Sequence, residues 1–376
     1  MSIPVLPVVI EPLLKPKPWG GQRLATLLNK RLPAGERIGE SWELVSLPGN
    51  ESRVRDGPLA GRTLSELMQL WGRDLLGDAN LIEGRFPLLL KFLDACENLS
   101  VQVHPKPTGR GGPPGVKHEA WYVVHAEPGA KLFIGLKPGV GPADVARVAN
   151  TPALVDMLRV WEGRPGQCYY LPSGTLHALG AGLVVAEIQT PSDVTYRAYD
   201  WNRVDAAGRA RELHVGQALQ NIRYDVTEEM IAPPQTQLEA SSIPATRLAR
   251  CDRFVLDLLS LSAGISYPLS ANQNAQRQPA PAPSPDEPAH GFMRVWIILA
   301  GALRFAREDQ EPRYTDTFAK GDVTLIPANS AGLRADPAVD CRCLQVTIPA
   351  AKRFQEPFPD VDRIQLPCSG RALSRP

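Results

Sequence analysis

Side chains of the kinds that bind divalent metal ions occur in three short apolar segments. Gln102 and His104 lie in LSVQVH, Glu119 opens EAWYVVHA, and His177 follows the turn PSGT. In a β-strand, residues i and i+2 project from the same face, so the polar ends of Gln102 and His104 can converge. Two imidazoles, a carboxylate and an amide oxygen form a four-ligand set that suits Zn²⁺ or another borderline divalent ion. The spacing therefore indicates a metal site, although a single histidine in a strand often has only a packing role.

A second group of charged residues lies in AEIQTPSDVTYRAYDWNR, residues 186–203. Arg197 and Arg203 could form an anion site, because a guanidinium group matches phosphate geometry. The alternative is a surface loop held by ion pairs. Lys91, in the apolar segment PLLLKFLDA, favours a site because a buried ammonium needs an anionic partner. Ser100 could donate to a phosphate oxygen or be an ordinary strand hydroxyl.

Most of the remaining chain consists of short apolar runs between Gly and Pro turns, which predicts a mainly β fold of sandwich or jelly-roll type with a few attached helices. Strands are expected within residues 87–95, 99–104, 119–126, 130–136, 167–172, 182–189, 254–261, 294–306 and 322–328.

Two segments have helical periodicity. The first lies within residues 61–77, where Thr63 is the expected N-cap, Glu66 completes a capping box and Gly77 ends the helix. The second covers about residues 142–161, and its internal proline is expected to divide it.

The chain is expected to form two domains, residues 1–240 and 241–376, since 376 residues fit two domains of ordinary size. CYYLPSGTLHALG and DVTLIPANSAGLRA form a weak internal repeat, and only the first contains a histidine. This asymmetry predicts that the first domain contains the metal site and that the second has only a structural role. The proline-rich segment 271–290 is expected to be a solvated insertion, followed later by an irregular C-terminal tail.

Composition excludes several classes of partner. There are 41 Lys and Arg against 40 Asp and Glu, for a net charge of +1, so nucleic-acid binding is not expected. No apolar stretch is long enough to span a membrane. The six cysteines form no C-x-x-C pair and are expected to be free thiols in the cytoplasm. Monomer and homodimer both remain open.

Several long motifs resemble type I mannose-6-phosphate isomerase, a family of metal-dependent cupins. The resemblance rests on PLLLKFLDACENLSVQVHPK, KHEAWYVV, LPSGTLHALG, VVAEIQTPSDVTYRAYDWNR and GRARELHVGQAL, with support from KPWGG and GESWELVS. It covers roughly residues 9–221 and is thinner over residues 245–349. It implies two cupin-like jelly-roll barrels and the interconversion of mannose 6-phosphate and fructose 6-phosphate through an enediolate.

The resemblance also implies roles for individual residues. A zinc ion would be bound by Gln102, His104, Glu119 and His177. The matching active-site residues are Arg197 and Glu187, with Glu187 as a candidate base, and those expected to contact the sugar phosphate are Lys91, Ser100 and Arg203.

The sequence also departs from the family pattern. The loop at 108–116 is glycine-rich, and His118 stands where a small hydroxyl residue is expected. Strand alternation predicts that His118 faces away from the metal if Glu119 faces it. A non-catalytic cupin that binds sugar phosphates and an isomerase of a related sugar phosphate remain the alternatives.

Overall fold

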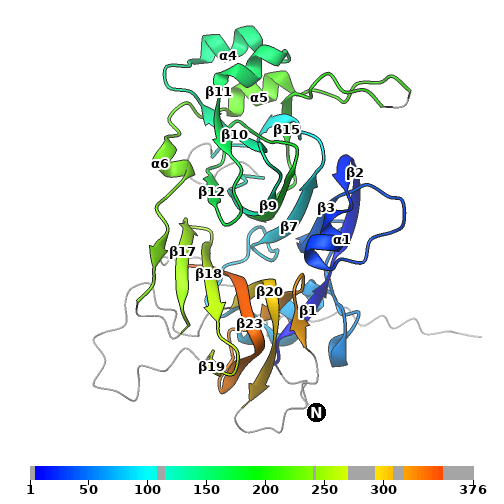
Figure 1. Ribbon diagram of the computed structural model, residues 1–376, viewed down its shortest axis with the longest axis vertical. Coiled ribbons are helices and arrows are strands. Elements are labelled where there is room, and N and C mark those ends of the chain that lie inside the picture. Colours follow the sequence, from blue (N-terminus) through cyan, green and yellow to red (C-terminus); the bar gives the residue numbers. More distant parts are fainter. Residues whose placement is uncertain are drawn as a thin grey trace, which may run out of the picture.

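The computed structural model describes most of the chain, namely residues 5–107, 115–205, 207–239, 243–269, 293–307 and 317–349. The predicted proline-rich insertion at 271–290 and the C-terminal tail lie outside the described residues, as does most of the glycine-rich loop at 108–116. The predicted mainly β fold with a few attached helices is confirmed, and the strands form three principal antiparallel sheets (Figure 1).

The first sheet, here called the site sheet, is buried on both faces. Within one of its strands, Val184 and Ala186 contact one apolar cluster while Val185 contacts another, which is the two-residue alternation of a strand. This burial explains why its strands appear as nearly continuous apolar runs in the sequence. In spatial order the strands are β12 (Cys168–Leu171), β9 (Glu119–Ala126), β14 (Leu183–Gln189), β7 (Leu89–Ala95), β3 (Ile38–Leu44) and β2 (Leu13–Gly21).

The second sheet, here called the facing sheet, packs its apolar side chains against one face of the site sheet. Leu132 and Leu179 of the facing sheet share a buried cluster with Leu93 and Val123 of the site sheet. The two sheets therefore enclose a common interior. In spatial order the facing strands are β11 (Leu158–Glu162), β10 (Lys131–Leu136), β13 (His177–Leu179), β8 (Val101–Val103) and β15 (Tyr196–Tyr199).

The third sheet, here called the C-terminal sheet, also takes in strands from the beginning of the chain. Val8 pairs with Leu325, so the first strand extends a sheet built mainly from the last third of the protein. The predicted boundary near residue 240 stays a prediction. In spatial order the strands are β16 (Thr236–Gln237), β17 (Ala245–Arg250), β18 (Val255–Leu261), β23 (Leu333–Thr347), β20 (Arg294–Arg307), β22 (Val323–Ile326), β1 (Val8–Glu11) and β6 (Arg53–Val54), with β19 (Tyr267–Pro268) and β21 (Phe318–Ala319) at its margins.

The expected helix within residues 61–77 is present as two pieces. Thr63 caps the first piece through a capping box with Glu66, as predicted, and Gly77 ends the second. Gly72 divides them with a backbone φ of 50°, a left-handed value that glycine adopts without steric cost. The pieces are α2 (Leu64–Trp71) and α3 (Arg73–Leu76).

The helical prediction for residues 142–161 was wrong at its C-terminal end. Pro152 does divide the segment, but the residues from Leu158 onward form β11, because their backbone pairs with β10 from Leu136 to Lys131. A pairing with a distant strand outweighed the local helical pattern. The helical parts are α4 (Pro142–Val148) and a 3₁₀ turn (Pro152–Met157).

Short elements complete the structure. Three further helices are α1 (Arg23–Leu28), α5 (Val215–Asn221) and α6 (Glu228–Ile231), with a 3₁₀ turn at Gly57–Leu59 and a small hairpin of β4 (Ser46–Leu47) and β5 (Asn50–Glu51). α4 and α5 lie together at the end of the molecule away from β20 and β23 (Figure 1).

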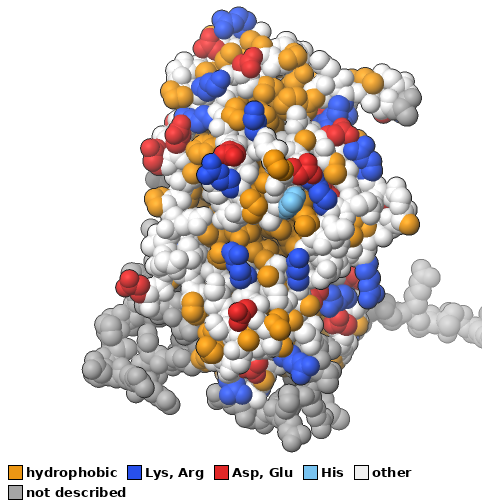
Figure 2. Space-filling model, viewed as in Figure 1, with side chains coloured by type: hydrophobic (Ala, Val, Ile, Leu, Met, Phe, Trp, Pro, Cys, Tyr) orange, Lys and Arg blue, Asp and Glu red, His pale blue; other side chains and the backbone are white. Residues whose placement is uncertain are grey.

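In the part of the chain that the structure describes, no closed barrel is formed: the site sheet packs on the facing sheet, and the C-terminal strands belong to one open sheet. Of the helices described, none combines the length and the apolar character needed to cross a membrane. Acidic and basic side chains are interspersed over the face shown in Figure 2, in keeping with the balanced net charge.

Candidate active site

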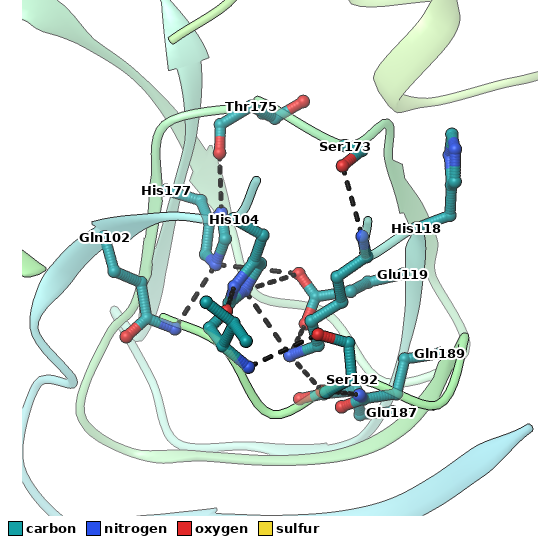
Figure 3. A network of polar contacts seen from close by, with 12 residues as sticks. Gln102, His104, His118, Glu119, Ser173, Thr175, His177, Glu187, Gln189 and Ser192 are labelled. Atoms are coloured by element: carbon teal, nitrogen blue, oxygen red, sulfur yellow. Dashed lines mark hydrogen bonds and ion pairs between the residues drawn. The ribbon is translucent and has the colours of Figure 1, made fainter. Parts of the chain in front are cut away.

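Three predicted metal ligands converge in the interior between the site sheet and the facing sheet. His104 follows β8, Glu119 begins β9 and His177 begins β13. One ligand atom from each residue lies within 4.8 Å of the others. Nε2 of His104 is 3.3 Å from Oε2 of Glu119, and Nε2 of His177 is 3.6 Å from the same oxygen (Figure 3). All three side chains are buried, so the cluster is shielded from bulk water.

The opposite nitrogen of each imidazole is held by a backbone carbonyl. Nδ1 of His104 lies 2.8 Å from the carbonyl oxygen of Val194, and Nδ1 of His177 lies 2.8 Å from that of Thr175. Since a carbonyl can only accept, each Nδ1 donates its proton and each neutral ring presents the lone pair of Nε2 to the centre. This arrangement orients metal-binding histidines in many proteins.

The protonation states also suit a cation. Burial lowers the pKa of His104, and it lowers that of His177 to about 4, so both rings are neutral near pH 7. Burial acts against the charge on Glu119, yet the ammonium of Lys117, which contacts this carboxylate, holds its pKa well below the usual range. Oε2 of Glu119 is buried without a hydrogen-bond partner. Three lone-pair groups thus face one point, and these residues fit a bound divalent metal.

Gln102, the fourth predicted ligand, lies beside the cluster. Its backbone pairs with His177, and its amide nitrogen is 3.4 Å from Nε2 of that residue. The amide oxygen accepts a hydrogen bond of 3.0 Å from the hydroxyl of Ser100. A half-turn of the terminal amide would present the oxygen to the centre instead, so its role as a ligand stays a prediction.

Lys117 is a member of the site to which sequence reasoning gave no role. Its ammonium contacts one carboxylate oxygen of Glu119 and lies 3.1 Å from Oε1 of Glu187. Burial opposes its charge, but these two carboxylates outweigh that effect and raise the pKa of the lysine. Strand alternation could have identified it, because residues 117 and 119 differ by two and share a face.

Glu187 completes the polar centre. It lies on β14 directly beside Lys91 of β7 and Trp121 of β9. Burial raises the pKa of Glu187 to about 7, against the opposing influence of the Lys117 ammonium. A carboxyl group that titrates near neutrality can both accept and return a proton under physiological conditions.

A cavity of about 230 Å³ opens onto this centre. Its wall is rich in charged side chains, with cations in excess over carboxylates, and both sheets contribute to it. The lining residues central to the site are Lys91, Gln102, Lys117, Glu187, Arg197 and Arg211.

Comparison with known proteins identifies the family of this chain. Residues 8–125 match the model of the type I phosphomannose isomerase catalytic domain. The chain is 31% identical over 340 residues to mannose-6-phosphate isomerase ManA of Bacillus subtilis, a match that covers 89% of this chain and 97% of that protein. The chain belongs to the type I phosphomannose isomerase family. A mannose-6-phosphate isomerase of Streptococcus mutans is 36% identical over 219 residues, covering 57% of this chain and 66% of that protein.

A solved structure of the family has the same fold. The crystal structure of the mannose 6-phosphate isomerase from Bacillus subtilis is 26% identical and superposes with a TM-score of 0.74. The superposition covers 91% of this chain and all of that one. The predicted family resemblance is therefore confirmed.

In this phosphomannose isomerase family member, Lys91 is buried and paired, as its apolar setting predicts. Its ammonium lies 3.2 Å from a carboxylate oxygen of Asp193 and 3.7 Å from one of Glu40. It also lies 4.4 Å from the centre of the Trp42 ring. The ammonium is thus already neutralised by the protein, and Ser100, the other predicted contact on this side, donates to Gln102.

The two arginines predicted to form an anion site have different surroundings. Arg197 lines the cavity and its strand position lies opposite Gln102. The guanidinium of Arg203 is instead bound by Asp200 at 2.5 Å and by the carbonyl of Asn98 at 2.6 Å. The structure places Arg211, rather than Arg203, with Arg197 in the cavity wall.

His118 faces away from the centre, as strand alternation predicts. Its Nδ1 lies 2.8 Å from the hydroxyl of Tyr170, on the opposite side of the strand from Glu119 (Figure 3). It is therefore not positioned to compete for a metal held by His104 and His177.

Proposed function

We propose that this protein interconverts mannose 6-phosphate and fructose 6-phosphate in its cavity, with one zinc ion held by the buried cluster. The observation that carries the proposal is the meeting of His104, Glu119 and His177 around one point, with Lys117 and Glu187 at its side. The names of the family relatives support the choice of substrate.

The cluster offers the metal two neutral imidazoles and a carboxylate, and Gln102 would supply a fourth group. When bound, zinc supplies Lewis-acid stabilisation for oxygen atoms that gain negative charge. The donor set of nitrogen and oxygen suits zinc and leaves room for a further ligand.

Moving the carbonyl between adjacent carbons requires one proton to leave carbon 2 of the aldose and return to carbon 1, and the hydroxyl proton on oxygen 2 to pass to oxygen 1. Glu187 is our candidate for this transfer, because its pKa of about 7 allows both forms of the carboxyl group at neutral pH. Lys117 lies 3.1 Å from it, so the ammonium orients the carboxylate and opposes excess negative charge.

The enediolate formed by removal of the proton has a negative charge on its oxygens. Arg197 lines the same cavity, and its guanidinium group is held by the backbone carbonyl of Glu212 at 3.0 Å. A fixed positive group near developing charge lowers the barrier without reorganisation at the moment of reaction.

Turnover measured together with metal content tests the proposal. Purified protein should convert mannose 6-phosphate to fructose 6-phosphate in a coupled assay and contain about one zinc ion per chain. Chelation should abolish turnover, and zinc should restore it. Tight binding of mannose 6-phosphate without formation of fructose 6-phosphate would contradict the proposal and favour the non-catalytic alternative.

The same proposal places the reaction in the cytoplasm. The described cysteines at positions 96, 168, 251, 341 and 343 are free thiols, which supports a reducing compartment. The two closest of these, Cys341 and Cys343, lie on one strand with their sulfurs 3.5 Å apart.

A further inference from the structure

The segment after β15 of the facing sheet returns to lie against that strand. The backbone N–H of His214 donates to the carbonyl of Arg197 at 2.7 Å, and the N–H of Arg197 lies 3.3 Å from Nδ1 of His214. The Arg197 guanidinium donates to the carbonyl of Glu212. These three contacts hold the segment so that Arg211, the residue before Glu212, lies with Arg197 in the wall of the cavity.

Arg211 stands farther out than the metal cluster. The side chain of Arg211 is 35% exposed, whereas those of His104 and Glu119 are 2% exposed. Arg197 lies directly across the strand pair from Gln102, next to that cluster. The wall thus runs from Gln102 past Arg197 to Arg211 near the mouth.

The other cations of the cavity are closely paired with carboxylates. Lys17 lies 3.1 Å from Glu40, and Lys117 lies 3.1 Å from Glu187. Lys91 is paired as described above. Because these carboxylates neutralise them, the three ammonium groups would attract a bound anion only weakly.

The two arginines are less completely neutralised. Arg211 approaches Asp200 only to 3.5 Å, and the same carboxylate oxygen is already bound by Arg203 at 2.5 Å. Arg197 donates to a backbone carbonyl, and its buried Nε has no hydrogen-bond partner. Burial lowers the pKa of Arg197, and the adjacent Arg211 lowers it further, because two positive groups repel. An anion beside both would relieve this repulsion.

We infer that Arg211 anchors the phosphate group of the substrate at the mouth of the cavity, next to Arg197. The inference rests on the proposed function and identifies the residue that selects phosphorylated sugars. A phosphate monoester bound by Arg211 places the far end of a hexose, with carbons 1 and 2, toward Gln102 and the metal cluster. Energy from this remote contact orients the reacting carbons.

Binding of a substrate analogue that cannot react tests the inference. Mannitol 6-phosphate has no carbonyl group, and mannitol is its match without phosphate. Isothermal titration calorimetry of the zinc-loaded protein gives the ratio of the dissociation constant of mannitol to that of mannitol 6-phosphate. Arg211→Ala should lower this ratio at least about tenfold, and Arg211→Lys should lower it less, because an ammonium keeps the charge but loses the bidentate geometry. A general disturbance of the cavity would weaken both ligands and leave the ratio unchanged.

Arg209→Ala is the matched control. This arginine is two residues away, is 79% exposed and pairs with Asp205. Its replacement should leave the ratio within about twofold of the wild-type value. A ratio in Arg211→Ala within twofold of the wild-type value would overturn the inference. Because this experiment measures binding alone, its outcome is independent of whether the wild-type protein turns over mannose 6-phosphate.

Discussion

The ammonium of Lys117 lies 3.1 Å from Oε1 of Glu187 and also contacts Glu119. One buried lysine therefore joins a carboxylate of the metal cluster to the carboxyl group that we propose as the proton carrier. The charge of this lysine is held by both partners, and Lys117 in turn opposes the effect of burial on the pKa of Glu187. The candidate metal site and the proposed acid–base group therefore form one electrostatic unit.

We expect Lys117→Met to lower kcat at least about 100-fold. Without the ammonium, the pKa of Glu187 rises further and the carboxyl group is protonated at neutral pH. Zinc should remain bound, because His104, Glu119 and His177 are retained, and metal analysis checks this. Lys131→Met, at an exposed position of β10, serves as the control. Unchanged kcat in a folded, zinc-loaded Lys117→Met protein would exclude a role for this lysine in the reaction.

Replacement of either histidine of the cluster should remove the metal. His104→Ala and His177→Ala each delete one of two neutral nitrogen donors, so both variants should lose most of their zinc and about 100-fold or more in kcat/KM. Elemental analysis and the coupled assay measure the two effects. His125→Ala, on the same strand as Glu119, should keep both metal and activity. Full activity of a metal-free His177→Ala protein would refute the assignment.

Glu40 should make stability depend on acid pH. Burial opposes its ionisation, but the ammonium groups of Lys91 and Lys17 and the indole N–H of Trp42 lower its pKa from 4.5 to about 2. The unfolded chain therefore takes up a proton near pH 4.5 while the folded protein does so only near pH 2. The stabilisation, on the order of 3 kcal/mol, is complete above pH 4.5 and is lost between pH 4.5 and pH 2.

Urea denaturation of Glu40→Gln measures this contribution. At pH 7 the variant should have a free energy of unfolding lower by roughly 3 kcal/mol, and the difference should narrow at pH 3. Glu36→Gln, at an exposed position, should behave as wild type at both values. A difference of equal size at pH 7 and pH 3 would contradict the ion-pair origin of the effect.

The cap of α2 should contribute a measurable amount to stability. The hydroxyl of Thr63 accepts from the backbone N–H of Glu66 at 3.1 Å, and the Glu66 carboxylate accepts from the N–H of Thr63 at 2.7 Å. Thr63→Ala should lower the free energy of unfolding by about 1 kcal/mol, whereas Thr63→Ser should retain most of it. Equal stability of the Ala and Ser variants would show that the cap contributes nothing.

The sequence by itself determined the local structure and most of the candidate site. Runs of apolar residues between turns predicted β9 at its full length, because burial on both faces of a strand leaves a continuous pattern. The Q-x-H spacing predicted a shared direction for Gln102 and His104, since strand geometry fixes it. Thr63 and Glu66 predicted a helix start, because both partners of the cap lie within one turn.

Only the tertiary structure decided which distant residues meet. Leu158–Glu162 became a strand because β10 was available to pair with it. Arg211 replaced Arg203 in the cavity wall because the segment after β15 folds back onto Arg197, while Arg203 is bound by Asp200. Lys117 acquired its role from Glu187, 70 positions later in the chain. Local patterns encode burial and direction, whereas distances between side chains far apart in sequence depend on strand register and sheet packing.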